Sequence, residues 1–323
     1  MKRISPLTSQ RLLEAYETMW RIRLFEQRAA SMFANAELPG FIHLSVGQEA
    51  VATGAIGALR RDDYITATHR GHGQIIAKGG ALTPMFAELM GRTGGYCRGR
   101  GGSMHIFSLE LGVLGANGIL GASQPIGVGA ALASQYRDDG RVTVTFFGEG
   151  ASAQGAVHEA MNLASVWKLP VVFVVEANGW AELTPYPVHV GVDTLTRRAD
   201  GYGMPAQQVD GNDLEAVHDA TAVAVAHARE GSGPAMVEVL TTRWHGHYEG
   251  DPQKYRDQDE LKTLEDHCPI RRLGDKLVQA GVADQARLDE LQQLVRDAVE
   301  QAVKEAKQSP LPETSELMQG VYR

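Results

Sequence analysis

The chain has 323 residues, of which 43% are hydrophobic and 22% charged, a composition typical of a globular protein. Its net charge of -8 argues against binding nucleic acid through bulk charge, and its two cysteines are too few for a disulfide framework. The longest apolar run, residues 169–175, is too short to span a membrane, and residues 1–6 lack the apolar core of a secretion signal, so we expect a cytoplasmic protein.

The first predicted element is one helix over residues 9–36, because apolar side chains recur there every three or four positions. Residues 37–125 are dense in glycine and histidine, and we expect them to be mostly loop. Long loops in compact domains are usually functional or disordered. Apolar residues continue throughout this stretch, which favours function over disorder.

The segment from residue 125 to residue 178 carries the clearest pattern. It predicts a small-residue helix over 125–135, a buried strand over 141–147, a glycine turn at 148–150, a helix over 156–167 and a second strand over 171–175. Strand, helix and strand in this order form a βαβ unit, so the sheet should be parallel.

The pattern repeats more weakly further on, and then changes to helix. We expect a strand near 207–209, a helix over 214–229, a strand over 235–240, a charged amphipathic helix around 288–303 and an extended tail from Pro310. The pattern therefore predicts an α/β protein with a parallel sheet, and the length allows one large domain or two smaller ones. The parts of the chain are the N-terminal helix, a βαβ core over about 115–240, and a C-terminal helical region and tail over about 257–323.

Glu149 and Asn178 follow two successive strands and are the first candidate site. Ligands of parallel sheets bind beyond the carboxyl ends of the strands, where both residues should lie. The glycines beside Glu149 allow backbone N–H groups to approach a phosphate, and carboxylate and carboxamide oxygens suit Mg²⁺. This pair therefore predicts a magnesium–diphosphate clamp. The alternative is a plain turn with a surface glutamate and a capping asparagine.

Histidines in glycine-flanked loops form the second candidate set. Six of the 11 histidines stand in such loops: His43, His69, His72, His105, His245 and His247. Histidine serves as acid, base or anion partner near neutral pH. A zinc site at His69 and His72, or at His245 and His247, is the alternative, although no HExxH motif is present.

Arg70 stands between two of these histidines, and its guanidinium group matches the geometry of a phosphate. The alternative is a solvated arginine. The glycine-rich run 94–102 does not read as a dinucleotide site, because no GxGxxG motif stands there between a strand and a helix. No P-loop motif and no serine-hydrolase elbow is present either.

Residues 148–150 followed by Asn178 resemble the thiamine-diphosphate motif, which is usually Gly-Asp-Gly with an asparagine about thirty residues later. Further segments match the same family: Gly40-Phe41-Ile42-His43, Gly47-Gln48-Glu49-Ala50, Gly99-Arg100-Gly101-Gly102-Ser103-Met104-His105, Gly115-Ala116-Asn117-Gly118-Ile119, Trp167-Lys168-Leu169-Pro170, and Gly246-His247 with Tyr255-Arg256. From about residue 10 to the tail, the chain resembles the alpha subunit of the decarboxylating component of 2-oxo acid dehydrogenase complexes. Residues 69–72 and 246–251 look most like the acetoin dehydrogenase branch.

The resemblance implies a single thiamine-diphosphate-binding domain over residues 1–323, with helices on both faces of its parallel sheet, and a role for each matching residue. Glu149, Asn178 and the backbone carbonyl of Trp180 would hold Mg²⁺. The other expected positions are His69, Arg70, Gly148, Gly150 and Ala151 around the diphosphate, Gly118 and Leu120 at the aminopyrimidine, His247 at the diphosphate end facing the reacting carbon, and His43 and His72 on the substrate side. His43, His72 and His247 are thus the expected catalytic residues.

Four positions depart from the usual pattern of this family. Glu149 replaces the commoner aspartate, as in branched-chain relatives, so metal binding should survive. Ala177 stands where an asparagine is usual, and Trp180 replaces a tyrosine, which is tolerable if only its carbonyl binds. His69 replaces a tyrosine of the pyruvate enzymes and favours acetoin as the substrate, with pyruvate and branched-chain 2-oxo acids as alternatives.

The resemblance also implies that this chain works with others. The carboxylate that tautomerises the aminopyrimidine would come from a separate beta subunit, in an assembly of two alpha and two beta chains. The acyl group would then pass to a lipoyl-bearing acyltransferase. We further expect residues 244–256 to become ordered on cofactor binding, a permanently ordered loop being the alternative. Two other hypotheses are a regulatory protein that kept the fold without catalysis, and a zinc hydrolase.

Overall fold

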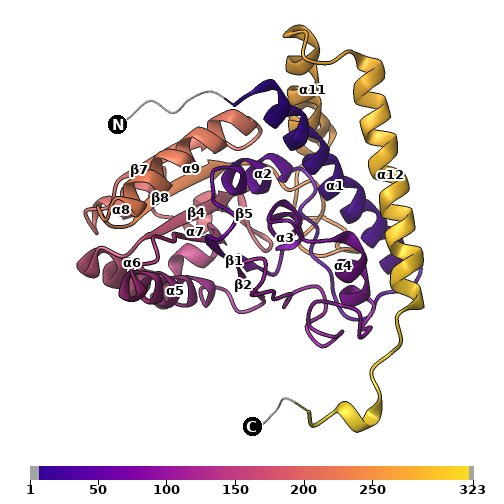
Figure 1. Cartoon of the computed structure of the whole chain (residues 1–323). Coiled ribbons are helices and arrows are strands. Elements are labelled where there is room, and N and C mark those ends of the chain that lie inside the picture. Colours follow the sequence, from indigo (N-terminus) through magenta and orange to yellow (C-terminus); the bar gives the residue numbers. More distant parts are fainter. Residues whose placement is uncertain (1–6, 320–323) are drawn as a thin grey trace.

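The computed structural model describes residues 7–319 (Figure 1), so the expectation about residues 1–6 and the end of the predicted tail lie outside the described residues. Six parallel strands form the central sheet, in the order β2-β1-β3-β4-β8-β7. Their bounds are β1 Tyr64–Thr68, β2 Val113–Asn117, β3 Thr143–Gly148, β4 Val171–Ala177, β7 Ala206–Asp210 and β8 Ala235–Leu240. The predicted parallel-sheet α/β fold is confirmed.

Alternation along the central strand β4 divides the core into two layers. Val172 and Val174 pack into one buried cluster, whereas Phe173 and Val175 pack into the other, as the two-residue period of a strand requires. On the first face lie α2 (Glu49–Gly57) and α9 (Leu214–Arg229); on the second lie α5 (Ser123–Arg137) and α6 (Gly155–Trp167).

Long helices flank the first of these layers. The N-terminal helix α1 (Ser9–Ala34) begins after Thr8, whose side chain accepts a hydrogen bond from Arg11 N and caps the helix. It contacts α12 (Gln285–Gln308), which runs along it at one side of the molecule (Figure 1), and α11 (Pro269–Gln279). The remaining short elements are α3 His72–Ala77, α4 Leu82–Leu89, α7 Tyr186–His189, α8 Thr196–Asp200, α10 Gln258–Thr263, the hairpin β5 Trp180–Ala181 and β6 Thr184–Pro185, and the turns η1 Ala151–Ala153, η2 Leu264–His267 and η3 Thr314–Glu316.

Most of residues 37–125 lie in loops and turns, as predicted, but the stretch also contains five helices and strands that were not predicted. This stretch holds α2, β1, α3, α4 and β2, so the sheet begins at Tyr64 rather than near residue 115. The physical reason is burial: eight of the nine residues of α2 are buried, which removes the alternation of polar and apolar residues that marks a surface helix. The elements predicted between residues 125 and 240 are present, with shifts of a few residues at their ends.

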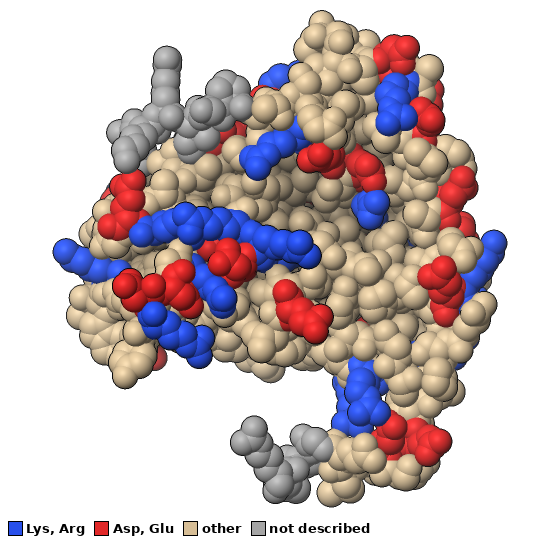
Figure 2. All heavy atoms as spheres, in the orientation of Figure 1, with Lys and Arg blue, Asp and Glu red and all other residues tan. Residues whose placement is uncertain are grey.

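The strands of the sheet end level with one another. Gly148 at the end of β3 lies opposite Glu176, and Thr68 at the end of β1 lies opposite Asn117. The segments that leave β1, β2, β3, β4 and β8 therefore meet at one edge of the sheet. On the face of the molecule shown in Figure 2, positive and negative side chains are interspersed. No helix within residues 7–319 is both long and apolar enough to cross a bilayer.

Candidate active site

A cavity of about 200 Å³ lies at this edge of the sheet. Most of the residues that line the cavity stand at or just beyond the carboxyl end of a strand, where ligands of parallel sheets bind. The lining comprises Gln48, Thr68, His69, Arg70, Leu120, Gly148, Glu149, Gly150, Ala151, Glu176, Asn178, Trp180, Ala181, Glu182, Arg243 and His247.

Glu149 is fully buried, which excludes the alternative of a surface glutamate. Its Oε2 accepts a hydrogen bond of 3.3 Å from Asn178 N, while its Oε1 has no hydrogen-bond partner among residues 7–319. Burial raises the pKa of Glu149 to about 7. A buried carboxylate oxygen without a partner is costly, so the chemistry of this atom fits that of a metal ligand. Asn178 Oδ1 accepts a hydrogen bond of 3.2 Å from Trp180 N, so the three predicted metal ligands are neighbours.

Glycine at position 150 is required by the packing of the chain around it. A Cβ atom there would lie 2.7 Å from the Cβ of Ala181 on the hairpin that follows Asn178. The φ angle of Gly150 is an ordinary -61°, so backbone strain is not the reason. The glycine therefore lets the turn after β3 approach the chain that carries Asn178 and Trp180.

Two buried arginines, Arg70 and Arg243, lie in the same cavity, and within residues 7–319 neither forms an ion pair of 4.0 Å or less with a carboxylate. Arg70 donates hydrogen bonds to the carbonyl oxygens of Leu44 (2.6 Å) and His247 (3.0 Å), so it is not a solvated arginine. Arg243 donates to the carbonyl oxygens of His245 and Glu182 and to the hydroxyl of Tyr255. Burial, followed by the charge of Arg243, lowers the pKa of Arg70 to about 9, which keeps it charged at neutral pH. Such a pair of cations predicts an anionic ligand.

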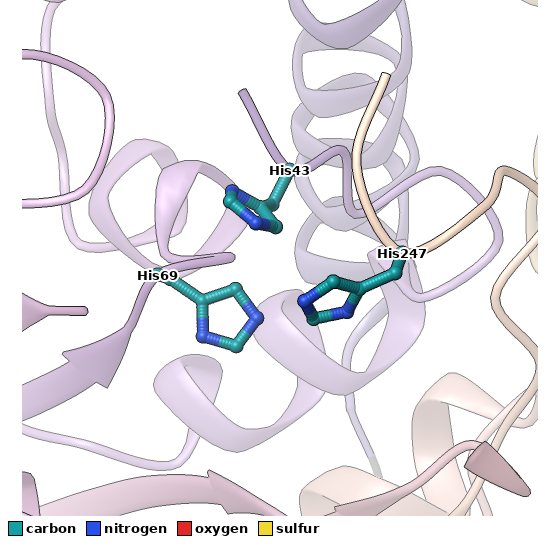
Figure 3. A group of neighbouring side chains, drawn as sticks. All are labelled: His43, His69 and His247. Carbon is teal, nitrogen blue, oxygen red and sulfur yellow. The ribbon is translucent and has the colours of Figure 1, made fainter. Parts of the chain in front are cut away.

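Three histidines from distant segments, His43, His69 and His247, lie close together (Figure 3). His69 and His247 line the cavity together with the two arginines. The ring centroid of His43 lies 4.6 Å from that of His69 and 5.1 Å from that of His247. Burial, and after it the charge of Arg70, lowers the pKa of His43 to about 3, of His69 to about 2 and of His247 to about 4. All three imidazoles are therefore neutral at neutral pH and can both donate and accept hydrogen bonds.

Neither histidine pair of the zinc alternative forms a site. His72 is bound on both ring nitrogens within the protein, and His245 Nδ1 lies 3.1 Å from a carboxylate oxygen of Glu249. The nitrogens that do converge, within 4.8 Å of one another, belong to His43, His69 and His247. The adjacent charges of Arg70 and Arg243 repel a cation at that point, so the electrostatics favour an anionic occupant of the cavity over zinc.

Comparison with known proteins identifies the family of this site. The family model of the dehydrogenase E1 component matches residues 17–315. The chain belongs to the dehydrogenase E1 component family. This family depends on thiamine diphosphate, and its alpha subunits work with beta subunits and an acyltransferase core. The predicted resemblance is confirmed, and the chain is an oxidoreductase subunit.

Several relatives match over nearly the full length of this E1 chain. The alpha subunits named acetoin:2,6-dichlorophenolindophenol oxidoreductase from Bacillus subtilis and Cupriavidus necator are each 45% identical, over 98% of this chain and 95% and 96% of theirs. The pyruvate dehydrogenase E1 component subunit alpha of Rhizobium meliloti is 40% identical over 94% of this chain and 88% of its own.

Most residues predicted for the E1 site line the cavity, but three do not. His43 contacts the two lining histidines through its ring. Gly118 lies against His105, where a Cβ would be 3.4 Å from Nε2. His72 is fully buried away from the cavity, between Glu26 and Ser103, so the expectation that it lines the substrate side does not match its position.

Sequence reasoning missed five polar residues of the cavity, namely Gln48, Thr68, Glu176, Glu182 and Arg243. Glu176 lies at the end of β4, where its Oε1 accepts a hydrogen bond of 2.8 Å from Gln74, and burial raises its pKa to about 7. Arg243 follows β8. The signal was available for these two, because both stand where a predicted buried strand ends, as Glu149 and Asn178 do.

Proposed function

We propose that this chain is the alpha subunit of an acetoin-cleaving dehydrogenase that binds thiamine diphosphate through Mg²⁺. The observation that carries the proposal is the buried, unpartnered Oε1 of Glu149 beside Asn178, facing the same cavity as Arg70 and Arg243. The carboxylate and carboxamide would supply hard oxygen ligands to Mg²⁺, together with the carbonyl of Trp180. The arginines would bind the negative charge of the diphosphate.

Thiamine diphosphate, when bound, supplies the electron sink for breaking the bond next to a substrate carbonyl. The residues of this chain provide orientation, charge and proton transfer. Neutral His43, His69 and His247 can donate a hydrogen bond to an oxygen that gains negative charge, or accept a proton from a hydroxyl group. Leu120, 45% exposed, provides an apolar wall against which the cofactor would bend.

Acetoin is favoured as the substrate by the 45% identity to two acetoin:2,6-dichlorophenolindophenol oxidoreductase subunits and by the histidine at position 69. Acetoin is uncharged and carries a hydroxyl group, which the neutral imidazole of His69 can bind. Pyruvate and branched-chain 2-oxo acids carry a carboxylate and are the alternatives, the first supported by 40% identity to a pyruvate dehydrogenase subunit.

The proposed partners are a beta subunit in a two-plus-two heterotetramer and a lipoyl-bearing acyltransferase core. Large apolar side chains near the cavity are exposed, with Phe41 61%, Ile119 70% and Leu120 45% accessible in the isolated chain. Such groups usually mark a surface that another chain covers. A cytoplasmic location stays a prediction.

Calorimetric titration tests the cofactor part of the proposal. Thiamine diphosphate would be titrated, with and without Mg²⁺, into this chain co-expressed with its candidate beta subunit. We expect Mg²⁺-dependent binding that Glu149→Ala abolishes and that Glu159→Ala, which changes an exposed glutamate of α6, leaves intact. No binding by the assembled wild-type protein would contradict the proposal and favour a regulatory protein that lost catalysis.

Substrate choice needs a separate assay with 2,6-dichlorophenolindophenol as the electron acceptor. We expect kcat/KM for acetoin to exceed that for pyruvate by at least about tenfold, because an imidazole nitrogen that accepts a hydrogen bond from the hydroxyl group of acetoin finds no donor on the carboxylate of pyruvate. Faster turnover of pyruvate or of a branched-chain 2-oxo acid would overturn the acetoin assignment. It would leave the cofactor assignment intact.

A further inference from the structure

A buried acid–base pair lies behind the cavity, where three segments of the chain meet. The Glu26 carboxylate on α1 is fully buried, and its Oε2 lies 2.9 Å from Nδ1 of the equally buried His72. Nε2 of His72 lies 2.9 Å from Oγ of Ser103. Both nitrogens of His72 are therefore engaged within the protein, so His72 cannot contact a substrate without breaking a buried hydrogen bond.

The second oxygen of Glu26 holds the segment that carries His43. Oε1 accepts hydrogen bonds from Ser45 N (2.9 Å) and from Ser45 Oγ (2.7 Å). Leu44, between His43 and Ser45, accepts the hydrogen bond from Arg70 in the cavity. Residues 43–45 are thus held by a carboxylate on one side and by a guanidinium group on the other, and the His43 ring extends from the held segment to the cavity histidines.

The glycine-rich run 94–102, which does not form a dinucleotide site, forms the other support. It wraps around the fully buried carboxylate of Glu88 on α4. That carboxylate accepts four backbone hydrogen bonds, from the amides of Cys97, Gly99, Gly101 and Gly102. These amides are engaged by the protein's own carboxylate, so the run forms a supported loop that presents Ser103 to His72.

We propose that Glu26 and His72 are positioning residues for the dehydrogenase reaction, setting the His43 ring through Ser45 and fixing the glycine-rich loop through Ser103. This inference rests on the proposed function. Proton transfer requires hydrogen-bond reach between the side chain and the reacting group. A displacement of about 1 Å can reduce a rate by about a hundredfold. The buried pair would control that distance without contacting cofactor or substrate.

Ser45→Ala in the assembled protein is the first test, because it removes one hydrogen bond to Glu26 and keeps the backbone one. We expect kcat to fall by about tenfold, as the loss of a buried hydrogen bond to a charged group allows. Glu26→Gln, which removes the charge facing His72, should act in the same direction. The matched control is Ser134→Ala, which should leave kcat unchanged. Ser134 is a buried serine of α5 whose hydroxyl has no hydrogen-bond partner in the described part of the chain.

A double-mutant cycle separates positioning from general structural support. If Ser45 acts through His43, Ser45→Ala should change kcat by less than about twofold once His43 is already alanine. Fully additive effects of the two substitutions would overturn the proposal. So would an unchanged kcat in both Ser45→Ala and Glu26→Gln.

A crystal structure of the Ser45→Ala assembly gives a readout that does not depend on activity. We expect the His43 ring to be displaced relative to His69 and His247, and an unmoved ring would contradict the positioning role. If the proposed function is wrong, the wild-type assembly will show no dehydrogenase activity. The position of the His43 ring in the Ser45→Ala structure tests the positioning role separately, with or without that activity.

Discussion

At the scale of single residues, burial acts differently on the two kinds of basic side chain around the cavity. It lowers the pKa of the three histidines far below neutral pH, so they lose their charge. It lowers the pKa of Arg70 only to about 9, so the guanidinium group stays positive. The cavity therefore combines the positive charge of the arginines with neutral histidines that can transfer protons. The arginines suit an anionic cofactor, and the histidines suit a substrate that gains and loses protons during the reaction.

The depressed histidines predict a pH-dependent stability. Their folded pKa values lie below the value of about 6.5 expected in the unfolded chain, so below that pH the unfolded chain binds more protons than the folded one. Stability should therefore fall as the pH decreases from about 6.5 to about 4, by up to about 1.4 kcal/mol per pH unit for each histidine. At His247, the charges of Arg70 and Arg243 lower the pKa further, whereas the charge of Asp251 raises it.

Urea unfolding of the cofactor-free assembly at several pH values measures this slope. His69→Gln should reduce it by about one proton, because one of the three depressed groups is removed. An identical slope in wild type and variant would show that His69 does not titrate differently in the two states.

Arg70→Lys should weaken cofactor binding. A lysine keeps the charge but cannot donate to Leu44, His247 and a phosphate in a fixed fork. We expect the Kd for thiamine diphosphate to rise by about 10- to 100-fold, the range for losing hydrogen bonds to charged groups. Calorimetry with Arg21→Lys as the control measures it, since Arg21 makes only an exposed ion pair with Glu17. An unchanged Kd would remove Arg70 from the diphosphate site.

At the scale of elements, the hairpin after β4 explains two departures from the family pattern. Ala177 is the buried last residue of β4, and its carbonyl accepts a hydrogen bond of 3.0 Å from Thr241 N. The ring of Trp180 packs edge-on against Tyr255, with centroids 5.1 Å apart. The tryptophan side chain therefore contacts the loop that follows β8. The proposed metal ligand is the backbone carbonyl of Trp180, which does not depend on the type of side chain.

The loop over residues 244–256 is tied to distant segments by backbone hydrogen bonds from Trp244 to Val46 and from Glu249 to Ile42. Asp251 anchors it internally, accepting from His247 N and from the hydroxyl of Tyr255 at 2.7 Å each. These contacts need no cofactor and support the alternative of an ordered loop. Ordering on cofactor binding stays a prediction.

Limited proteolysis of this loop distinguishes the two. The side chain of Lys254 is exposed and offers a trypsin site. The rate of cleavage there depends on how readily the backbone around it opens. If the cofactor orders the loop, thiamine diphosphate with Mg²⁺ should slow cleavage by at least about fivefold, and Asp251→Asn should speed cleavage without cofactor. Lys254→Gln identifies the cut. A cleavage rate that is slow and unaffected by cofactor would establish a permanently ordered loop.

At the scale of the whole molecule, the cavity is built by one chain but is not enclosed by it. Ile119 and Leu120 stand in the connection between β2 and α5, next to the cavity, and both are exposed in the isolated chain. Exposed apolar groups beside a polar site are costly in water, and an interface would cover them. The proposed beta subunit would complete the site at this place.

Ile119→Glu should therefore impair assembly rather than folding. At 70% exposure the change removes little buried apolar area from this chain, but it would bury a carboxylate at the interface. We expect loss of co-purification with the beta subunit and an unchanged circular dichroism spectrum. Leu311→Glu in the C-terminal tail, 63% exposed, is the control and should assemble normally. Normal assembly of Ile119→Glu would show that the beta subunit does not cover this rim.

The sequence by itself determined the elements whose pattern is local. The strand, turn, helix and strand between residues 141 and 178 carry their own periodicity, and the rule that ligands lie beyond strand ends located Glu149 and Asn178. The later elements β7, α9 and β8 were predicted for the same reason, because their periodicity is also local. Short buried elements such as α2 carry no such period, because every face of them is covered, and they were missed.

Only the tertiary structure decided what each histidine does. His72 looked like a site residue because of its neighbours Arg70 and Gly71, yet its partner Glu26 stands 46 residues away and its partner Ser103 stands 31 residues away. His43, His69 and His247 come from three separate segments that meet only in the folded chain. Local periodicity records which face of an element is buried, whereas contacts between distant segments depend on how those faces pack, which no local pattern contains.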